Sequence, residues 1–375
     1  MIRTNRTLLI LVLAIAALPA LSLAQSSRSA GAVFAMTNGA DRNQIIAYQR
    51  NGDGSLSARH TFFTGGRGSG GTTDPLASQG SLTLTQDHSF LLAVNAGSGD
   101  ISVFGVFGST LWLVDKVPCG GSEPVAVAQH GNLVYVLNAG AASNVTGFRL
   151  EWDGRLQRIT GSTAFLSTGN SGAASLAFSP NGEFLLVTEK LTGEIDAFHV
   201  QDNGTLAPIV ETPSAGPGLF AVTFAPNGTA LAIETGPAGG TNASAISSYA
   251  VQPNGKLTVV NASVPTLGAA TCWHVVTPNG KYVYMSNAGS GTISGFAIGT
   301  DGALTPIAGT VVATLPSGST NLDIAVSANG KFLYTLDSGT GTVGEFSINA
   351  DGTLNSLGEA GGISVAAGFN GIAAI

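Results

Sequence analysis

The stretch SLAFSPNGEFLLVTEKLTGEIDAFHVQDNGTLAPI, residues 175–209, returns three more times along the chain. The copies are AVTFAPNGTALAIETGPAGGTNASAISSYAVQPNGKLTVV at 221–260, WHVVTPNGKYVYMSNAGSGTISGFAIGTDGALTPI at 273–307 and DIAVSANGKFLYTLDSGTGTVGEFSINADGTLNSL at 323–357. Their first turn glycines, Gly182, Gly228, Gly280 and Gly330, are spaced by roughly 50 residues, a period typical of β-propeller blades.

Each copy reads as four strands. An apolar strand A, an Asn-Gly turn, strand B, a glycine-rich loop, strand C, an Asp-Gly or Asn-Gly turn and strand D follow in that order. We expect the Asn-Gly and Asp-Gly pairs to form two-residue type I′ turns, which need positive φ at both central residues. Strand A is apolar on both faces, as expected for a strand placed between neighbouring blades.

The ends of the chain complete the repeat. Weaker copies lie at 81–104 and 124–156, and residues 32–56 match strands B, C and D with no strand A before them. The last six residues, NGIAAI, resemble a strand A alone. The sequence therefore predicts an all-β fold, a seven-bladed β-propeller of four-stranded antiparallel blades, closed by pairing the C-terminal strand with the N-terminal blade.

The first residues have the pattern of an export signal. Arg3 and Arg6 precede an apolar run over 8–18, Pro19 and the small-residue site Ser22-Leu23-Ala24. This predicts a signal peptide over 1–24 and a single propeller domain over 25–375, in a secreted or periplasmic protein. The apolar run is too short for a permanent anchor, so we expect no membrane association after cleavage. We also expect a monomer in solution.

The composition of the chain limits the classes of partner that it could bind. A net charge of -7 without a basic cluster argues against nucleic acid and favours a small-molecule ligand. No HExxH, CxxC or histidine-rich motif occurs, so we expect neither a cofactor nor a catalytic metal, although an acidic channel mouth could hold a cation such as calcium.

The stretch around Cys272 invites a catalytic reading, because His274 follows two residues later. His274 aligns with apolar positions between blades in the other repeats, so we expect a packed, hydrogen-bonded histidine rather than a base. Strand alternation puts Cys272 and His274 on one face. Cys119 and Cys272 fall near opposite sides of the ring, so no disulfide is expected between them.

Candidate site residues come from two rings of positions. In each blade the A–B and C–D turns lie on one face, here called the turn face, and the D–A and B–C loops lie on the other, the loop face, where function is expected. Polar residues end strand B, and a second ring opens strand A beside the channel. Together they predict a ligand cup at the loop-face mouth, made by Glu123, Asn138, Phe220, Trp273, Asn287, Asp323, Asp337 and Asn370.

Glu189 and Glu234 end strand B in two central repeats and are the predicted catalytic bases, provided that burial raises the pKa of their carboxyls. For the asparagines in the same ring, local turn hydrogen bonds are the alternative. Lys190, next to Glu189, is interpreted as a surface ion pair of little energetic value.

The motifs SPNGEFLLVTEKLTGEIDAFHVQDNGTL and TPNGKYVYMSNAGSGTISGFAIGTDGALTPI resemble the blade signature of the lactonase-type seven-bladed propellers, the family of 6-phosphogluconolactonase and 3-carboxymuconate cyclase. The resemblance covers essentially the whole mature chain. It implies the propeller fold and, for an enzyme, a lactonase (carboxylic ester hydrolase) or muconate cycloisomerase-like activity, with Glu189 and Glu234 matching the family's glutamates after strand B.

The sequence departs from that family where strand A opens. Relatives commonly carry Pro-Arg-His or Pro-His-Ser there, whereas this chain has Glu123-Pro124, Ala174-Ser175, Phe220-Ala221 and Cys272-Trp273. A phosphorylated substrate needs Arg or Lys to bind its charge, so a neutral or weakly charged lactone is the expected ligand. The competing hypothesis is a binding or scaffold propeller without catalysis.

Overall fold

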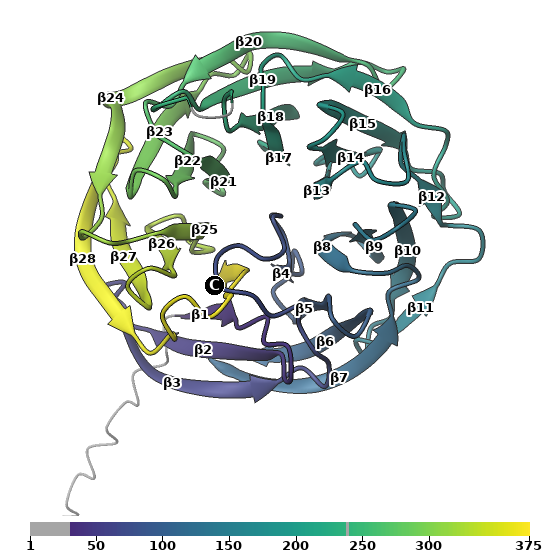
Figure 1. The fold of residues 1–375 in the computed structure, drawn as a ribbon, viewed down its shortest axis with the longest axis horizontal. Helices are drawn as coiled ribbons and strands as arrows, with labels where there is room; N and C mark the ends of the chain where they lie inside the picture. Colours follow the sequence, from purple (N-terminus) through teal and green to yellow (C-terminus); the bar gives the residue numbers. More distant parts are fainter. Residues whose placement is uncertain (1–30, 238–239) are drawn as a thin grey trace, which may run out of the picture.

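The computed structural model describes residues 31–237 and 240–375, and all regular structure in this part is β. Seven antiparallel sheets stand as blades in a ring around a central channel (Figure 1). The predicted all-β, seven-bladed propeller is therefore confirmed, whereas the predicted signal peptide lies outside the described residues. No helix in the described part is long and apolar enough to cross a membrane.

The strands of each blade run from the channel outward. Blade 1 contains β29 (Ile372–Ala374), β1 (Gly31–Met36), β2 (Gln44–Arg50) and β3 (Leu56–Phe63). Blade 2 contains β4 (Leu82–Leu84), β5 (Phe90–Asn95), β6 (Asp100–Phe107) and β7 (Thr110–Pro118). Blade 3 contains β8 (Pro124–His130), β9 (Leu133–Asn138), β10 (Asn144–Leu150) and, sharing the outer edge, β11 (Leu156–Arg158) and β12 (Ala164–Phe165).

Four complete repeats form the other blades. Blade 4 contains β13 (Ala173–Phe178), β14 (Phe184–Glu189), β15 (Glu194–His199) and β16 (Val210–Pro213). Blade 5 contains β17 (Leu219–Phe224), β18 (Thr229–Glu234), β19 (Ala245–Val251) and β20 (Leu257–Pro265). Blade 6 contains β21 (Thr271–Val276), β22 (Tyr282–Asn287), β23 (Thr292–Ile298) and β24 (Leu304–Thr314). Blade 7 contains β25 (Asn321–Val326), β26 (Phe332–Asp337), β27 (Thr342–Ile348) and β28 (Leu354–Gly361).

The ring closes as predicted. The C-terminal strand β29 pairs antiparallel with β1, with Val33 opposite Ala374 and Ala35 opposite Ile372. The side chains of Ile372, Ala373 and Ala374 are buried. Closure in this way pairs the inner edge of β1 and joins the two ends of the chain in one blade.

The hydrophobic core lies between blades rather than inside any one of them. One buried cluster joins Leu186 and Ile195 of blade 4 to Leu219 and Tyr249 of blade 5. Similar clusters join the other neighbouring blades. Both faces of strands A and B are therefore largely buried, which explains why most of their residues are apolar.

The tight turns differ from the expected type I′ geometry. In the A–B turn of blade 4, Gly182 has a φ of 73° but Asn181 has no positive φ. The Gly182 N–H donates to the Ser179 carbonyl at 2.8 Å, and Pro180 at the second turn position fixes φ near the value of a type I turn. The type I′ prediction was therefore wrong here. Asparagine is used because Asn181 Oδ1 accepts hydrogen bonds from the Ser179 hydroxyl (2.7 Å) and the Glu183 N–H (3.2 Å).

Candidate functional site

The polar residues that end strand B hold the loop face together. In blade 2, Asn95 accepts a 2.7 Å hydrogen bond from Thr64 of the preceding loop and donates to Ser102 of strand C at 2.8 Å. In blade 6, Asn287 accepts from Thr271 at 2.5 Å and donates to Ser294 at 2.8 Å. The predicted ligand residue Asn287 thus occupies a buried position, here called a clasp, where it joins strands A, B and C of its blade.

Two other predicted ligand residues are also buried at the end of strand B. Asn138 donates to Asn144 Oδ1 at 3.0 Å. Asp337 accepts from the Thr335 hydroxyl at 3.2 Å, and its Oδ1 atom has no hydrogen-bond partner within the described part of the chain. Burial raises the pKa of Asp337 well above its ordinary value.

Glu234 makes the most complete of these clasps. Its carboxylate accepts hydrogen bonds from the hydroxyls of Ser247 (2.7 Å), Ser263 (2.6 Å) and Ser214 (3.1 Å), and its side chain has no solvent exposure. The three donors come from strand C, strand D and the loop that enters the blade. Glu234 therefore joins strand C, strand D and this loop, and its side chain does not contact solvent.

Glu189 makes the corresponding clasp in blade 4, but it has a second carboxyl beside it. Ser167 donates to Glu189 through its backbone N–H at 2.8 Å and through its hydroxyl, and the Thr192 hydroxyl donates at 2.6 Å. Asp196 stands at the strand C position where Ser102, Ser247 and Ser294 stand in other blades. Both carboxyls are fully buried.

Burial and the neighbouring Glu189 charge raise the pKa of Asp196 to about 9. A protonated Asp196 can donate a hydrogen bond to Glu189, which explains how the pair is tolerated without a cation. Asp196 therefore keeps a proton at neutral pH.

The loop-face mouth of the channel is filled by a segment of the chain. Residues 74–80, here called the plug segment, belong to the long connection between blade 1 and blade 2, which Figure 1 shows reaching into the centre of the ring beside β4. Ser78 donates to the Val125 carbonyl at 2.9 Å, and the Gln79 N–H donates to the Ala174 carbonyl at 3.0 Å. Across the channel, the Gln79 amide also bonds to the backbone of His274.

Trp273 supports the plug segment from below. Its side chain is 1% exposed, packs at 5.4 Å against Phe220, and donates from Nε1 to the Ser78 carbonyl at 2.9 Å. Trp273 and Phe220 therefore form an apolar floor at the channel mouth, and the plug segment covers it.

The His274 ring is packed as expected but is not hydrogen bonded, although the His274 backbone bonds to Gln79. Neither ring nitrogen has a partner within the described residues, and burial lowers the pKa of His274 to about 3. A β-bulge interrupts the pairing between Thr271 and Trp273, so strict alternation does not run from Cys272 to His274. Cys272 is half-buried at the mouth, and both Cys119 and Cys272 are free thiols, as predicted.

Lys190 is the cation of the mouth. It is half-buried; its ammonium donates to the Ala77 carbonyl and lies 5.3 Å from the centre of the Phe220 ring. Desolvation lowers the pKa of Lys190, while the charges of Asp74, Cys272 and Glu123 oppose that shift. It is not the exposed surface ion pair that the sequence suggested.

Two carboxyls near the channel mouth have a pKa raised to about 7. Desolvation raises the pKa of Asp74, in the plug segment, to about 7, and the charge of Lys190 limits the rise. The Asn370 amide donates to Asp74 Oδ1 at 3.0 Å. Burial likewise raises the pKa of Asp323 to about 7, although the backbone N–H groups of Ile324 (2.9 Å) and Ile372 (3.1 Å) bond to its carboxylate.

The structure thus brings part of the predicted cup together. Glu123, Phe220, Trp273, Asp323 and Asn370 surround the plug segment, whereas the strand B residues lie in the buried clasps of their blades. Within residues 31–237 and 240–375 no group of three or more His, Cys, Asp or Glu side chains could hold a metal ion. A half-buried ammonium beside a carboxyl that titrates near pH 7 could polarise a carbonyl and accept a proton from water.

Sequence reasoning missed Asp74 and misjudged Lys190. Asp74 lies in a connection outside the repeat, so no alignment of blades could place it in the channel. For Lys190 a signal existed, because it directly follows the ring of strand B residues. For Asp196 the signal was an acidic residue at a position where three other repeats have serine.

Comparison with known proteins agrees with this architecture. The family model described as "Lactonase, 7-bladed beta-propeller" matches residues 126–236 and 222–321. No curated protein matches the sequence.

Solved structures share the fold at low identity. A periplasmic gluconolactonase from Pseudomonas aeruginosa has 16% identity and a TM-score of 0.67, over 92% of this chain and 99% of that one. A protein named "putative 6-phosphogluconolactonase" from Bacteroides uniformis has 19% identity and a TM-score of 0.66, over 92% and 99% of the two chains. Because the family model spans more than half of the sequence, the chain belongs to the lactonase family of seven-bladed β-propellers.

Proposed function

We propose that the protein hydrolyses a small, uncharged sugar lactone at the loop-face mouth of its channel. The observation that carries this proposal is the bond from the Lys190 ammonium to the Ala77 carbonyl of the plug segment, the segment that also holds Asp74, whose pKa is raised to about 7. Membership of the lactonase family and the fold shared with a periplasmic gluconolactonase support the same chemistry.

The chemistry needs one base and one cation. Ionised Asp74 removes a proton from water, and the water oxygen attacks the lactone carbonyl carbon. The Lys190 ammonium stabilises the negative oxygen that forms, as a preorganised charge does in a partly desolvated site. The ring carbon–oxygen bond then breaks, and the departing oxygen takes the proton held by Asp74, which leaves an open-chain hydroxy acid.

The charge of the mouth favours an uncharged substrate. The charges of Asp74 and Glu123 act on Lys190, and the charge of Asp323 acts on Asp74. A phosphorylated lactone would meet these carboxylates with only one cation to bind its phosphate. Gluconolactone is therefore a better probe than its 6-phosphate.

Asp74 is a better base than Glu189 or Glu234 because of solvent access. Asp74 is half-buried, whereas both glutamates are fully buried and already accept hydrogen bonds from hydroxyl groups. A substrate could reach either glutamate only by displacing a loop that the glutamate itself holds. The glutamates nevertheless stay in the test, because their family position predicts a catalytic role.

The test compares four variants in gluconolactone hydrolysis, with the spontaneous rate subtracted. We expect Asp74→Asn and Lys190→Met to lower kcat/KM by about 100-fold or more, in line with the loss of a general base or an oxyanion-stabilising group. Glu189→Gln and Glu234→Gln should retain activity in proportion to their folded fraction. Unchanged activity in Asp74→Asn, together with loss in Glu189→Gln at equal folded fraction, would reassign the base.

The second candidate is a ligand-binding propeller without turnover. It is favoured by the plug segment, which covers the floor made by Trp273 and Phe220 and already occupies the Lys190 ammonium. Saturable binding of gluconolactone with no hydrolysis above the spontaneous rate would support this candidate. The pattern in residues 1–24 supports export, which is tested by the N-terminal mass of the protein recovered outside the cytoplasm.

A further inference from the structure

A second concave region lies on the turn face, away from the candidate catalytic mouth. It is a hollow of about 570 Å³ between blades 4 and 5, here called the turn-face hollow. Four turns enclose it: the A–B turns of blades 4 and 5 and the C–D turns of blades 5 and 6. Its volume falls in the usual range for sites that bind small organic molecules.

The hollow offers apolar surface to a ligand. Phe224 is half-buried, Pro180, Pro226 and Pro253 are exposed, and Val260 is 37% exposed. Gly228 adds room, because a Cβ atom built there would meet nothing within 4 Å. The proline and phenylalanine rings and the valine side chain can pack against the C–H groups on the face of a saturated ligand ring.

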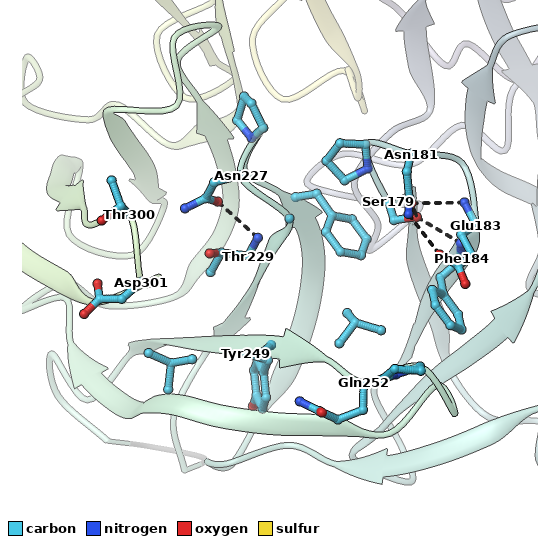
Figure 2. Close-up of a pocket in the computed structure, with 18 residues that line it drawn as sticks. Ser179, Asn181, Glu183, Phe184, Asn227, Thr229, Tyr249, Gln252, Thr300 and Asp301 are labelled. Carbon is cyan, nitrogen blue, oxygen red and sulfur yellow. Dashed lines mark hydrogen bonds between the residues drawn. The ribbon is translucent and has the colours of Figure 1, made fainter.

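Amide and carboxylate groups surround this apolar surface. Figure 2 shows Asn227, Thr300 and Asp301 on one side of the hollow, Asn181 and Glu183 on the other, and Gln252 along the edge between them. Asn181 and Asn227 each donate one amide hydrogen bond within the protein, to Glu183 (3.0 Å) and to the Gly299 carbonyl (3.2 Å). Each amide keeps a second N–H for a ligand.

Gln252 has the most unused capacity. Its side-chain amide makes no hydrogen bond within the described residues, so it can offer both a donor and an acceptor. Asp301 uses Oδ1 to accept the Ala303 N–H at 3.1 Å, which leaves Oδ2 available. Such paired donors and acceptors match vicinal hydroxyl groups.

The turn-face hollow differs in charge from a second hollow on the same face, here called the sister hollow. The sister hollow, of about 500 Å³ between blades 6 and 7, has Lys281 and Lys331 directly after its two A–B turn glycines. At the same positions the turn-face hollow has Glu183 and Thr229, and no lysine or arginine lines it. An anionic ligand therefore has no cation to bind in the turn-face hollow.

We propose that the turn-face hollow binds a neutral oligosaccharide. Proline and aromatic edges would contact the apolar faces of the sugar rings, and the Asn181, Asn227, Gln252 and Asp301 side chains would bind their hydroxyl groups. This role is independent of lactone hydrolysis, because the hollow and the channel mouth are on opposite faces of the ring. It gives the protein a means of attaching to a polysaccharide while the loop face stays accessible.

The test is calorimetric titration of the purified protein with maltotriose, cellotriose and the trimer of N-acetylglucosamine. We expect saturable binding of at least one of them. Gln252→Ala should weaken that binding by about fivefold, the usual effect of one lost hydrogen bond. Val260→Trp, which fills the hollow, should weaken it by about tenfold or more.

The matched control is Lys281→Ala in the sister hollow, which should bind the same sugar as the unmodified protein does. Gluconolactone hydrolysis by Gln252→Ala should also be unchanged, so failure of one proposal is distinguishable from failure of the other. The proposal is overturned if no neutral trisaccharide binds up to about 10 mM. It is equally overturned if both hollow variants bind normally, or if the charged trimers of glucosamine or galacturonate bind more tightly than the neutral sugars.

Discussion

Replacing Asp196 by asparagine tests the carboxyl pair inside blade 4. Asp196 is fully buried, both of its oxygens lack a hydrogen-bond donor in the described structure, and burial raises its pKa from 3.8 to about 9. At pH 7 the folded protein therefore holds a proton on Asp196 that the unfolded chain has released. Each pH unit above the ordinary pKa costs ~1.4 kcal/mol, so the upper limit at pH 7 is about 4 kcal/mol.

The sign of the pH dependence follows from proton binding. Between about pH 4 and pH 9 the folded state binds more protons than the unfolded state, so this group lowers the free energy of unfolding as the pH rises. The asparagine side chain of the variant needs no proton and can still donate to Glu189 through its amide. Asp196→Asn should therefore raise the free energy of unfolding, and the gain at pH 8 should exceed the gain at pH 5 by about 2 to 4 kcal/mol.

Urea unfolding followed by tryptophan fluorescence at pH 5 and pH 8 measures this difference. Asp202→Asn is the matched control, because Asp202 is exposed in the C–D turn of the same blade and the same chemical substitution there lies outside the buried carboxyl pair. A gain that is the same at both pH values, or a loss of stability at pH 8, would refute the protonated pair.

Three further outcomes follow from buried contacts. His274→Leu should remove an acid-sensitive group, since burial lowers the pKa of His274 to about 3 and its stabilising contribution, present above about pH 6.5, is lost as the pH falls. The rise in the midpoint of thermal unfolding should therefore be largest at pH 4, and an equal rise at pH 7 would contradict this. Trp273→Phe should lose the hydrogen bond to Ser78, worth about 1 kcal/mol, and trypsin should then cut faster after the exposed Arg67. An unchanged rate of cutting would show that Trp273 does not hold the plug segment. Deleting residues 372–375 should lower the free energy of unfolding by about 3 kcal/mol or more by opening the ring, and an unchanged urea midpoint would contradict closure through β29.

The repeat made the architecture predictable from sequence. Strand order, blade number and closure through the C-terminal strand all follow from where glycines and apolar residues recur. The turn type did not follow, because Pro180 before Asn181 decides the backbone angles and the Asn-Gly pair alone does not. A β-bulge at Cys272 likewise breaks the alternation on which the placement of its side chain depended.

The candidate site was only partly predictable for a different reason. Positions in the repeat locate Trp273, Phe220, Asp323 and Asn370 around the channel, but the plug segment comes from a connection with no counterpart in other blades. Whether Glu189 faces a ligand or a loop depends on Ser167 and Thr192, and no pattern in the sequence indicates those contacts. Asp74 meets Lys190 only after the ring has closed.

The pH dependence of gluconolactone hydrolysis tests the central claim most directly. If Asp74 is the base, the enzyme-catalysed kcat/KM should rise with pH through about 7, the pKa of its carboxyl, because only the ionised form accepts a proton. Asp74→Asn should lose both the activity and this transition. A rise near pH 7 that persists undiminished in Asp74→Asn would contradict the assignment, and so would a complete absence of catalysis in the unmodified protein.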